Sequence, residues 1–216
     1  TPMSAFFKNK NLNLLSSSPE RYIKRIKDRV VSQPIKGTSR RDQNDMVDSK
    51  LMNELEANIK ERSENIMIVD LIRNDLSRFS IPGSVIVKEL CKVYPFKQVH
   101  QMISTVESKI KSNLSSSEII KHTFPMGSMT GAPKVKAMNI IEDLEVSARG
   151  LYSGALGYIK PSGDFDFNVV IRSLIYDTNT KYLSFHVGSA ITSKSKILNE
   201  YDECLLKAEA MISVLK

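Results

Sequence analysis

Short runs of apolar and polar residues, separated by turn-forming residues, make up the start of the chain. The runs Ser4–Phe7, Leu12–Ser17 and Tyr22–Val31 are predicted to be short β-strands with turns between them. In Arg21–Arg29 the alternating residues are basic and apolar. That segment is therefore predicted to be an edge strand with one solvated face.

The period changes to that of a helix from Asp42 onward. Met46, Leu51, Leu55 and Ile59 recur at helical spacing, which predicts one amphipathic helix with Asp42 as its N-cap. A second helix is expected over residues 65–76, because the Pro/Gly turn at residues 79–83 ends it.

The rest of the chain alternates between strand and helix patterns. Further strands are predicted over Val85–Val93, Val99–Ile110, Ser153–Ile159, Asp164–Tyr176 and Tyr182–Val187, with hairpin turns at residues 161–163 and 177–180. Further helices are predicted over Glu118–His122, behind a capping box that starts at Ser115, over Lys134–Leu144, opened by Pro133, and over Leu198–Val214.

Hairpins rather than β-α-β crossovers connect these strands, which predicts an α+β fold with antiparallel sheets. No repeat or low-complexity linker divides residues 1–216, so a single domain is expected. The chain starts with Thr1 and enters a strand pattern almost at once. We therefore expect an N-terminal portion of the domain to be missing.

The composition is that of an ordinary soluble globular protein, with 41% apolar and 25% charged residues. No apolar run approaches the roughly 20 residues that cross a bilayer, and no secretory signal opens the chain. Cys91 and Cys204 show neither metal-ligand nor disulfide spacing. A reducing, cytoplasmic location is therefore expected.

The net charge of +7 raises the possibility of nucleic-acid binding. However, the lysines and arginines are scattered among acidic residues, and aromatic residues do not interleave with a basic stripe. An anionic small substrate explains the basic excess equally well.

Two pairs of glutamates show the spacing of neighbours on one helix face. Glu61 and Glu64 form the first pair and Glu200 and Glu203 the second. Four such oxygen donors, if the pairs face each other, suit Mg²⁺. Each pair alone is also typical of a solvated helix surface.

Two short segments place small residues beside groups that could bind or attack an anionic substrate. In Thr130–Lys134 small residues lead into a proline-opened helix, which leaves backbone N–H groups available for an anion; a plain N-cap is the alternative. In Pro34–Thr38 a lysine, Lys36, precedes a glycine in a tight turn. Without further context, such a lysine is simply solvated.

Taken in order, these motifs resemble those of the chorismate-utilising enzymes. The matching segments are Ser18–Arg21, Pro34–Thr38, the pair Glu61/Glu64, Ile68–Asp75, Thr130–Lys134 and the pair Glu200/Glu203, and the resemblance extends from Ser4 to Met211. Within this family, a lysine at the position of Lys36 resembles the aminodeoxychorismate synthases (component I). This branch of the family supplies 4-aminobenzoate for folate.

This resemblance implies a fold and a reaction. The fold would be an α+β sandwich of antiparallel sheets flanked by helices, with the active site in a central cleft. The reaction would convert chorismate and ammonia into 4-amino-4-deoxychorismate with Mg²⁺ as cofactor. A glutamine amidotransferase subunit would supply the ammonia.

The resemblance also implies two catalytic residues. The deprotonated amine of Lys36 would attack C2 of chorismate as the C4 hydroxyl leaves, and ammonia would then add at C4 and expel the lysine. Glu20 would protonate the departing hydroxyl. A salt-bridged strand glutamate is the alternative interpretation of Glu20.

The remaining roles are carried over by position. Glu64 and Glu203 would be the primary Mg²⁺ ligands, with Glu61 and Glu200 in support. The substrate-contacting residues would be Gly37, Thr38, Gln101, Thr130, Tyr152, Arg172, Gly188, Ser189, Ala190 and Lys207. Within this set, the loop of residues 188–190 would bind one carboxylate through its backbone. Lys207 could equally be an ordinary helical partner of Glu203.

One position departs from the family pattern. Gln101 stands where the family often has a histidine, and the chain's own histidine, His100, comes one residue earlier. Adjacent strand residues point to opposite faces, so His100 is not expected to substitute, although Gln101 could orient substrate oxygens. Arg73–Asp75 is expected to lock its helix to neighbouring loops.

Other functions stay open on the sequence alone. Anthranilate or isochorismate synthesis uses the same substrate, and only the turn around Lys36 argues strongly against it. An inactive, truncated domain that serves as a binding partner is an alternative of a different class.

Overall fold

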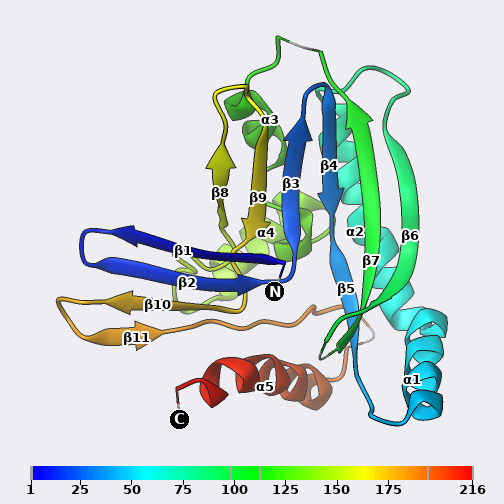
Figure 1. Ribbon diagram of the computed structural model, residues 1–216, viewed down its shortest axis with the longest axis vertical. Helices are drawn as coiled ribbons and strands as arrows, with labels where there is room; N and C mark the ends of the chain where they lie inside the picture. The colour runs from blue at the N-terminus through cyan, green and yellow to red at the C-terminus, as the bar shows by residue number, and fades with distance from the viewer. Residues whose placement is uncertain (1, 98, 112, 194, 216) are drawn as a thin grey trace. The chain divides into compact units, whose positions relative to one another are not determined.

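The computed structural model in Figure 1 describes residues 2–97, 99–111, 113–193 and 195–215. Its contacts divide the chain into two compact units. The first unit comprises Thr1–Glu20, Ala148–Gly157 and Asn168–Lys216, and the second comprises Arg21–Ser147 and Tyr158–Phe167.

A four-stranded antiparallel sheet forms the body of the first unit. Its strands are β1 (Met3–Asn9), β2 (Leu12–Ser18), β10 (Ser173–Asp177) and β11 (Tyr182–Ser184), in the order β1-β2-β10-β11. The carboxylate of Asp177 ties the β10–β11 turn together by accepting from the backbone N–H groups of Asn179 and Thr180. The unit ends with α5 (Ile197–Ser213).

The second unit contains most of a seven-stranded sheet. Its strands are β3 (Arg21–Ile26), β4 (Arg29–Gln33), β5 (Ile35–Arg40), β6 (Ile86–Pro95), β7 (Val99–Lys109), β8 (Ala155–Ile159) and β9 (Phe165–Val169). The order is β5-β7-β4-β3-β9-β8, with β6 also paired to β7. Residues 158–167 carry the parts of β8 and β9 that belong to this unit.

Strand β7 serves as the template for this sheet. β4 pairs with its second half and β5 with its first half, while β6 pairs along both halves. β4 and β5 therefore follow one another along one edge of β7, and β6 lies along the other (Figure 1). The break between β4 and β5 falls at Pro34, which has no N–H to donate to a ladder.

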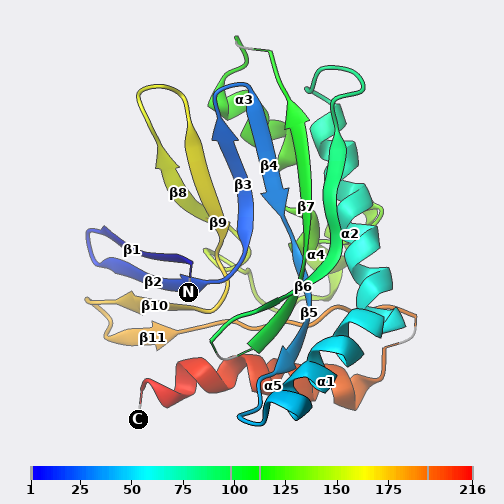
Figure 2. The same ribbon diagram turned by 45° about the vertical axis from the view of Figure 1, so that its right-hand side comes forward.

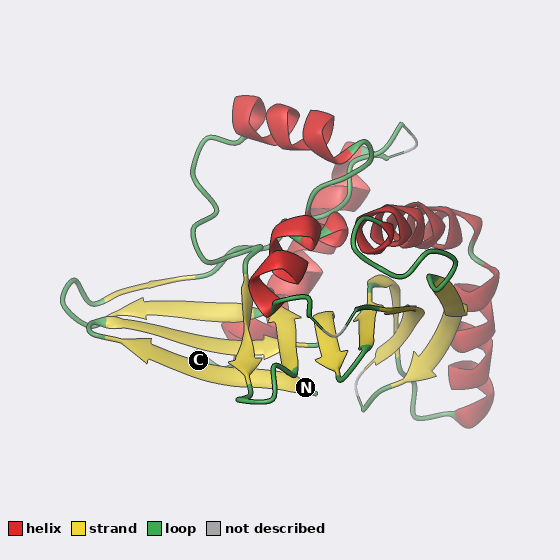
Figure 3. Cartoon of the chain, turned by 90° about the horizontal axis from the view of Figure 1, so that it is seen from above, coloured by secondary structure: helices red, strands yellow, loops and turns green. Residues whose placement is uncertain are grey.

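Two helices pack against this part of the sheet. α1 (Asp45–Ala57) and α2 (Ile59–Ser77) both contact β5, β6 and β7, as Figure 2 shows. Figure 3 shows α2 nearly end-on and α1 crossing it steeply. Leu55 of α1 forms a buried cluster with Cys91, Val93 and Met102 of β6 and β7. The cluster fixes α1 on the sheet because these side chains leave water together.

Shorter helices complete the second unit. They are α3 (Ser116–Thr123), the 3₁₀ turn η1 (Gly127–Met129) and α4 (Lys134–Leu144). The predicted capping box is confirmed, since Ser115 and Glu118 exchange side-chain-to-backbone hydrogen bonds. The predicted bounds of α4 are also confirmed. No helix within the described ranges is both long and apolar enough to cross a membrane.

The α+β class with antiparallel sheets is confirmed, but several local predictions were wrong. The N-cap of α1 is Asn44 rather than Asp42, because the Asn44 side chain accepts from the N–H groups of Met46 and Val47. The helix ends at Ala57, and Ile59 opens α2 instead. Met46 and Ile59 are 84% and 77% exposed, so neither contributes to the core.

The predicted edge strand Arg21–Arg29 was also wrong. β3 lies between β4 and β9, and its basic residues are held in place. Arg21 forms a two-pronged ion pair with Asp166 of β9. Arg25 is buried and donates to the backbone carbonyls of Lys27 and Leu114. The alternation of charge therefore reflects paired arginines inside a sheet rather than a solvated face.

We expect Asp48 to govern the acid stability of the α1–β7 contact. Its carboxylate accepts from Arg41, from the backbone N–H of Asp42 and from His100 Nε2 at 2.9 Å. The hydrogen bonds from Arg41 chiefly, then from Asp42, hold its pKa well below the ordinary value. This stabilisation is present above the unfolded-state pKa of about 3.9 and is lost as the pH falls through the folded-state pKa.

Asp48→Asn should therefore unfold more readily at neutral pH and lose less stability than the parent as the pH falls below about 4. Urea unfolding at a series of pH values measures both effects. Asp45→Asn, an exposed position in the same helix, is the matched control. If Asp48→Asn and the parent lose the same free energy of unfolding as the pH falls below about 4, Asp48 does not govern the acid stability of this contact.

Candidate functional site

Two carboxylates of the first unit converge on one hydroxyl. Glu200 and Glu203 lie one turn apart on α5, and Ser189 Oγ is within hydrogen-bond distance of an oxygen of each, at 3.0 Å in the case of Glu203. A serine hydroxyl has one proton and cannot fully satisfy both. Two carboxylates in this position favour a cation beside them.

Lys207 provides part of that positive charge. Its Nζ lies 2.6 Å from Glu203 Oε1 and donates to the backbone carbonyl of Gly188 at 2.9 Å. The helical pairing with Glu203 is thus present. The same ammonium also fixes the start of the Gly188–Ala190 loop against α5.

Arg172 lies where the predicted strand Asp164–Tyr176 breaks into β9 and β10. It adopts a left-handed backbone conformation with φ of 51°, which costs a non-glycine residue about 1–2 kcal/mol. Its guanidinium donates to the carbonyl of Lys207 at 2.9 Å. Burial lowers the pKa of Arg172, while Glu203 and Tyr152 oppose that effect. A half-buried arginine so close to α5 suits the binding of a carboxylate.

Tyr152 is held against the Gly188 loop by an aromatic stack. Its ring stacks on His186 with centroids 5.5 Å apart. A Cβ added at Gly188 would lie 2.8 Å from the Tyr152 hydroxyl oxygen, so only glycine allows this approach. His186 could not be predicted as a site residue, because neither periodicity nor a motif marks an aromatic residue two positions before the loop.

Glu20 is buried at 5% exposure. Its backbone N–H donates to Ser18 Oγ at 3.2 Å, and its carbonyl accepts from the N–H of Val169 at 3.1 Å. The residue is therefore anchored between Ser18 at the end of β2 and Val169 at the end of β9. A glutamate in this position is shielded from water, as an acid catalyst needs to be.

In the second unit, Lys36 stands in a bulge that touches α2. The β5–β7 register slips between Ile35 and Thr38, and Gly37 has φ of +91°. A Cβ added at Gly37 would lie 3.2 Å from both Cβ and Oε2 of Glu61. The glycine thus lets the chain beside Lys36 approach the first glutamate of the pair. Among the described residues, none forms an ion pair or hydrogen bond with the half-buried Lys36 ammonium.

Glu61 and Glu64 lie at the start of α2. The N–H of Glu61 donates to the Asn58 cap at 3.1 Å. Glu64 is 8% exposed and has an ion pair with Lys60 at 3.7 Å, but its Oε1 accepts no hydrogen bond from the described residues. A buried carboxylate oxygen with unused lone pairs is a suitable ligand for a hard cation.

Gln101 faces Thr38 across the β5–β7 ladder. It is 6% exposed, and its carbonyl oxygen accepts no hydrogen bond within the described structure. His100 is fully buried and bonded to Asp48, so it is not available to replace the histidine that Gln101 stands in for.

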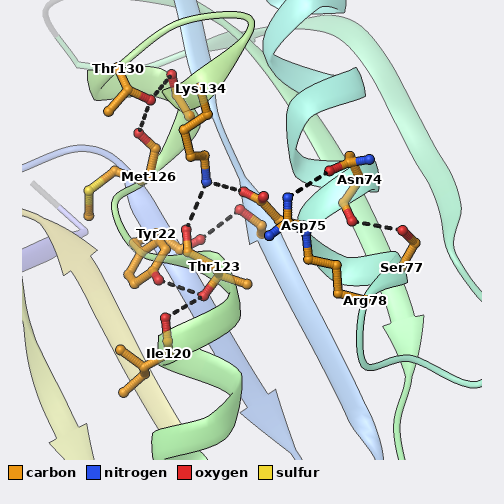
Figure 4. A network of polar contacts seen from close by, with 12 residues as sticks. Tyr22, Asn74, Asp75, Ser77, Arg78, Ile120, Thr123, Met126, Thr130 and Lys134 are labelled. Atoms are coloured by element: carbon orange, nitrogen blue, oxygen red, sulfur yellow. Dashed lines mark hydrogen bonds and ion pairs between the residues drawn. The ribbon is translucent and has the colours of Figure 1, made fainter. Parts of the chain in front are cut away.

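Thr130 ends the η1 turn before α4 (Figure 4). Its hydroxyl donates to the carbonyl of Met126 at 3.1 Å, with Gly127 as a weaker second acceptor. The hydroxyl proton therefore shapes the loop itself. Only the lone pairs of this oxygen are left for a substrate donor.

The sequence matches one known protein family along nearly its whole length. A family model described as "chorismate binding enzyme" matches residues 1–213. The chain belongs to the chorismate binding enzymes. This confirms the family that the motifs indicated.

Individual chorismate binding enzymes resemble the chain over nearly its whole length. The chain is 43% identical over 212 residues to "Aminodeoxychorismate synthase, chloroplastic" of Arabidopsis thaliana, covering 97% of the chain and 23% of that protein. It is 38% identical over 215 residues to "Aminodeoxychorismate synthase component 1" of Salmonella typhimurium, covering 100% of the chain and 47% of that protein. The chain thus spans about half the length, or less, of these relatives.

The solved structures of chorismate binding enzymes support the fold. Anthranilate synthase component I from Streptococcus pneumoniae superimposes with a TM-score of 0.87 at 32% identity, over 98% of the chain and 46% of that protein. Because an anthranilate synthase shares this fold with the aminodeoxychorismate synthases, the fold alone does not distinguish the reaction.

The structure brings the predicted residues together within each unit. In the first unit, Ser189, Glu200, Glu203, Lys207, Gly188, Arg172 and Tyr152 form one connected cluster. In the second unit, the Lys36 bulge meets Glu61, and Thr38 pairs with Gln101. Within the described residues, no three metal-ligating side chains gather in one place. The Mg²⁺ site therefore stays a prediction.

We expect Gly188→Ala to destabilise the first unit. The added methyl group would meet the Tyr152 hydroxyl at 2.8 Å, and the stack on His186 restrains the ring. Overpacking of this kind costs about 1–3 kcal/mol. Urea unfolding of Gly188→Ala measures the cost.

Tyr152→Phe provides the matched background, because it removes the oxygen and leaves the nearest ring carbon, Cζ, at 3.9 Å. In that background Gly188→Ala should cost less than half as much. An equal cost in both backgrounds would mean that the close approach is not what requires glycine.

Proposed function

We propose that the protein is the catalytic component of an aminodeoxychorismate synthase. It would convert chorismate and ammonia into 4-amino-4-deoxychorismate and water. The names of the relatives at 38–43% identity support this proposal. The chain spans only 23% and 47% of the length of these two relatives, so the reaction of the whole protein is part of the proposal.

The placement of Lys36 carries the proposal. A lysine without an ion-pair partner among the described residues stands in a glycine bulge directly beside Glu61. A surface lysine needs no such bulge, because a regular strand would present it to solvent equally well. A nucleophilic lysine does need a fixed position and an amine that is not held by a carboxylate.

The reaction proceeds in two displacements. The Lys36 amine forms a bond to C2 as the C4–O bond breaks, and the acid Glu20 gives its proton to the departing oxygen, which leaves as water. Ammonia then forms a bond to C4 as the bond between C2 and Lys36 breaks. The lysine amine is returned, and the net change is the replacement of the C4 hydroxyl by an amino group.

The first-unit cluster would bind one carboxylate of the substrate. Arg172 and Tyr152 lie beside the Gly188–Ala190 loop, and Lys207 fixes that loop. An arginine can donate two parallel hydrogen bonds to a carboxylate. Thr38, Gln101 and Thr130 would contact the remainder of the molecule.

Mg²⁺ would be held chiefly by Glu64 and Glu203, with Glu61 and Glu200 in support. Oε1 of Glu64 is buried and accepts no hydrogen bond among the described residues, with only the Lys60 ammonium 3.7 Å away, and Glu200 and Glu203 converge on one hydroxyl. Both features fit a cation with oxygen ligands. When bound, Mg²⁺ would supply positive charge for the second substrate carboxylate.

A partner would supply the ammonia. The name "component 1" of the Salmonella typhimurium relative fits a separate glutamine amidotransferase subunit. The product would then serve 4-aminobenzoate and folate synthesis. We place the reaction in the cytoplasm, because both cysteines are free thiols.

Anthranilate synthesis is the second candidate function. The similarity to the anthranilate synthase of Streptococcus pneumoniae favours it. Both reactions consume chorismate and ammonia, so only the identity of the product separates them.

The complete natural protein should convert chorismate into 4-amino-4-deoxychorismate when Mg²⁺ and an ammonium salt are supplied, and chelation of the metal should stop the reaction. Lys36→Ala should lower the rate by about 10³-fold or more, because no other residue can form the bond to C2. Mass spectrometry of the products measures both.

Lys36→Arg is the matched control, since it keeps the positive charge but has no nucleophilic amine at neutral pH. It should be as inactive as Lys36→Ala. Anthranilate or isochorismate as product would contradict the proposed reaction. A chain that binds chorismate without turnover would indicate a binding domain.

A further inference from the structure

A buried ion pair joins two of the family motifs within the second unit. Lys134, the first residue of α4, contacts the carboxylate of Asp75 in the last turn of α2 (Figure 4). The side chains are only 15% and 7% exposed. The same ammonium donates to the backbone carbonyl of Thr123 at 3.2 Å.

Neither charge suits the helix that carries it. A cation at a helix N-terminus and an anion near a C-terminus both oppose the helix dipole. Burial also raises the pKa of Asp75, and Lys134 is the main group that opposes this effect. Each charge is therefore stabilised by the other. If α2 and α4 were isolated helices, neutral residues at these two positions would be more favourable.

The pair closes the loop that contains Thr130. The loop leaves α3 at Thr123 and enters α4 at Lys134. The hydrogen bond from Lys134 to the Thr123 carbonyl therefore holds the two ends of the loop together. That carbonyl ends a helix and would otherwise need water as a donor.

The loop of residues 124–133 also packs against one face of α2. A Cβ added at Gly127, inside the loop, would lie 3.2 Å from Cβ of Leu71. Leu71 and Asp75 are four residues apart and so lie on the same helix face. The loop thus meets α2 at two points, through Gly127 and through Lys134.

Thr123 gives this arrangement a rigid base. Its hydroxyl donates to the Ile119 carbonyl at 2.9 Å and accepts from the Tyr22 hydroxyl at 2.6 Å. Burial raises the pKa of Tyr22 far above its ordinary value, so the phenol keeps the proton that it donates. Strand β3, α3, the loop and α2 are therefore connected through one set of hydrogen bonds.

We propose that Lys134 is a positioning residue, which fixes the loop of residues 124–133 on α2 and thereby sets where Thr130 meets the substrate. This inference rests on the proposed function for the role of Thr130. α2 also carries Glu61 and Glu64. Lys134 would thus hold the substrate loop and the proposed metal-binding helix in one fixed relation.

Kinetics of Lys134→Met in the complete natural protein test the proposal. We expect KM for chorismate to rise at least about fivefold and kcat/KM to fall about 10- to 100-fold, because small displacements of a binding group have effects of this size. Lys136→Met, an exposed lysine on the same helix, should leave both constants within about twofold of the parent.

Two further variants separate positioning from stability. Tyr22→Phe removes the hydrogen bond to Thr123 at the base of the loop but keeps the ring and both contacts of Lys134, so it should lower the melting temperature while leaving KM unchanged. Lys134→Met combined with Asp75→Leu removes both charges, so it should regain much of the stability lost by Lys134→Met alone. Its KM should stay raised. If KM returns to the parent value as stability is regained, Lys134 has only a structural role.

Hydrogen exchange tests the inference independently of activity. The amides of residues 124–131 should exchange faster in Lys134→Met than in the parent and in Tyr22→Phe. Unchanged exchange in this loop would overturn the proposal even if the enzyme makes 4-amino-4-deoxychorismate. Faster exchange in a protein that does not turn over chorismate would overturn the proposed function and leave the anchoring role of Lys134 intact.

Discussion

The pairing of β7 with its neighbours is the constraint on which the second unit depends. β4 and β5 share one edge of β7 and β6 takes the other, so the register of this one strand fixes three others. It places Gln101 opposite Thr38 and puts the bulge of Lys36 and Gly37 against α2. A slip of one residue would turn every side chain of β5 to the other face. The position of the proposed nucleophile is therefore a consequence of sheet register.

Polar residues occupy the buried stripe of α2 that a purely structural helix would fill with apolar ones. Glu64 and Asn65 lie at its start and Asp75 at its end, with Ile68 and Leu76 among the apolar residues of the same stripe. Burying such groups costs stability unless each finds a partner. Lys134 provides that partner for Asp75 in direct contact, whereas Oε1 of Glu64 has only the Lys60 ammonium at 3.7 Å and accepts no hydrogen bond in the described structure. This difference fits a structural role for Asp75 and a ligand-binding role for Glu64.

Local signals in the sequence predicted most elements, and non-local contacts explain the errors. The capping box at Ser115 and the proline before α4 act within a few residues, so their predictions were confirmed. β3 was taken for an edge strand because its neighbour β9 lies far along the chain. The break at Arg172 depends on a left-handed backbone that no residue pattern announces. The site residues could be predicted by family position, but the pairing of Lys134 with Asp75 and the stack of His186 on Tyr152 needed the structure.

Covalent bonding of Lys36 to the substrate is the step on which the proposed reaction depends, and intact-mass spectrometry detects it without a product assay. The complete natural protein would be incubated with chorismate and Mg²⁺ in the absence of ammonia, then quenched with acid. We expect a protein heavier by one chorismate less one water, with the added mass on the peptide that contains Lys36. Added ammonium should discharge this adduct. A protein that releases 4-amino-4-deoxychorismate with ammonia, yet carries no adduct at Lys36 without it, would rule out Lys36 as the nucleophile.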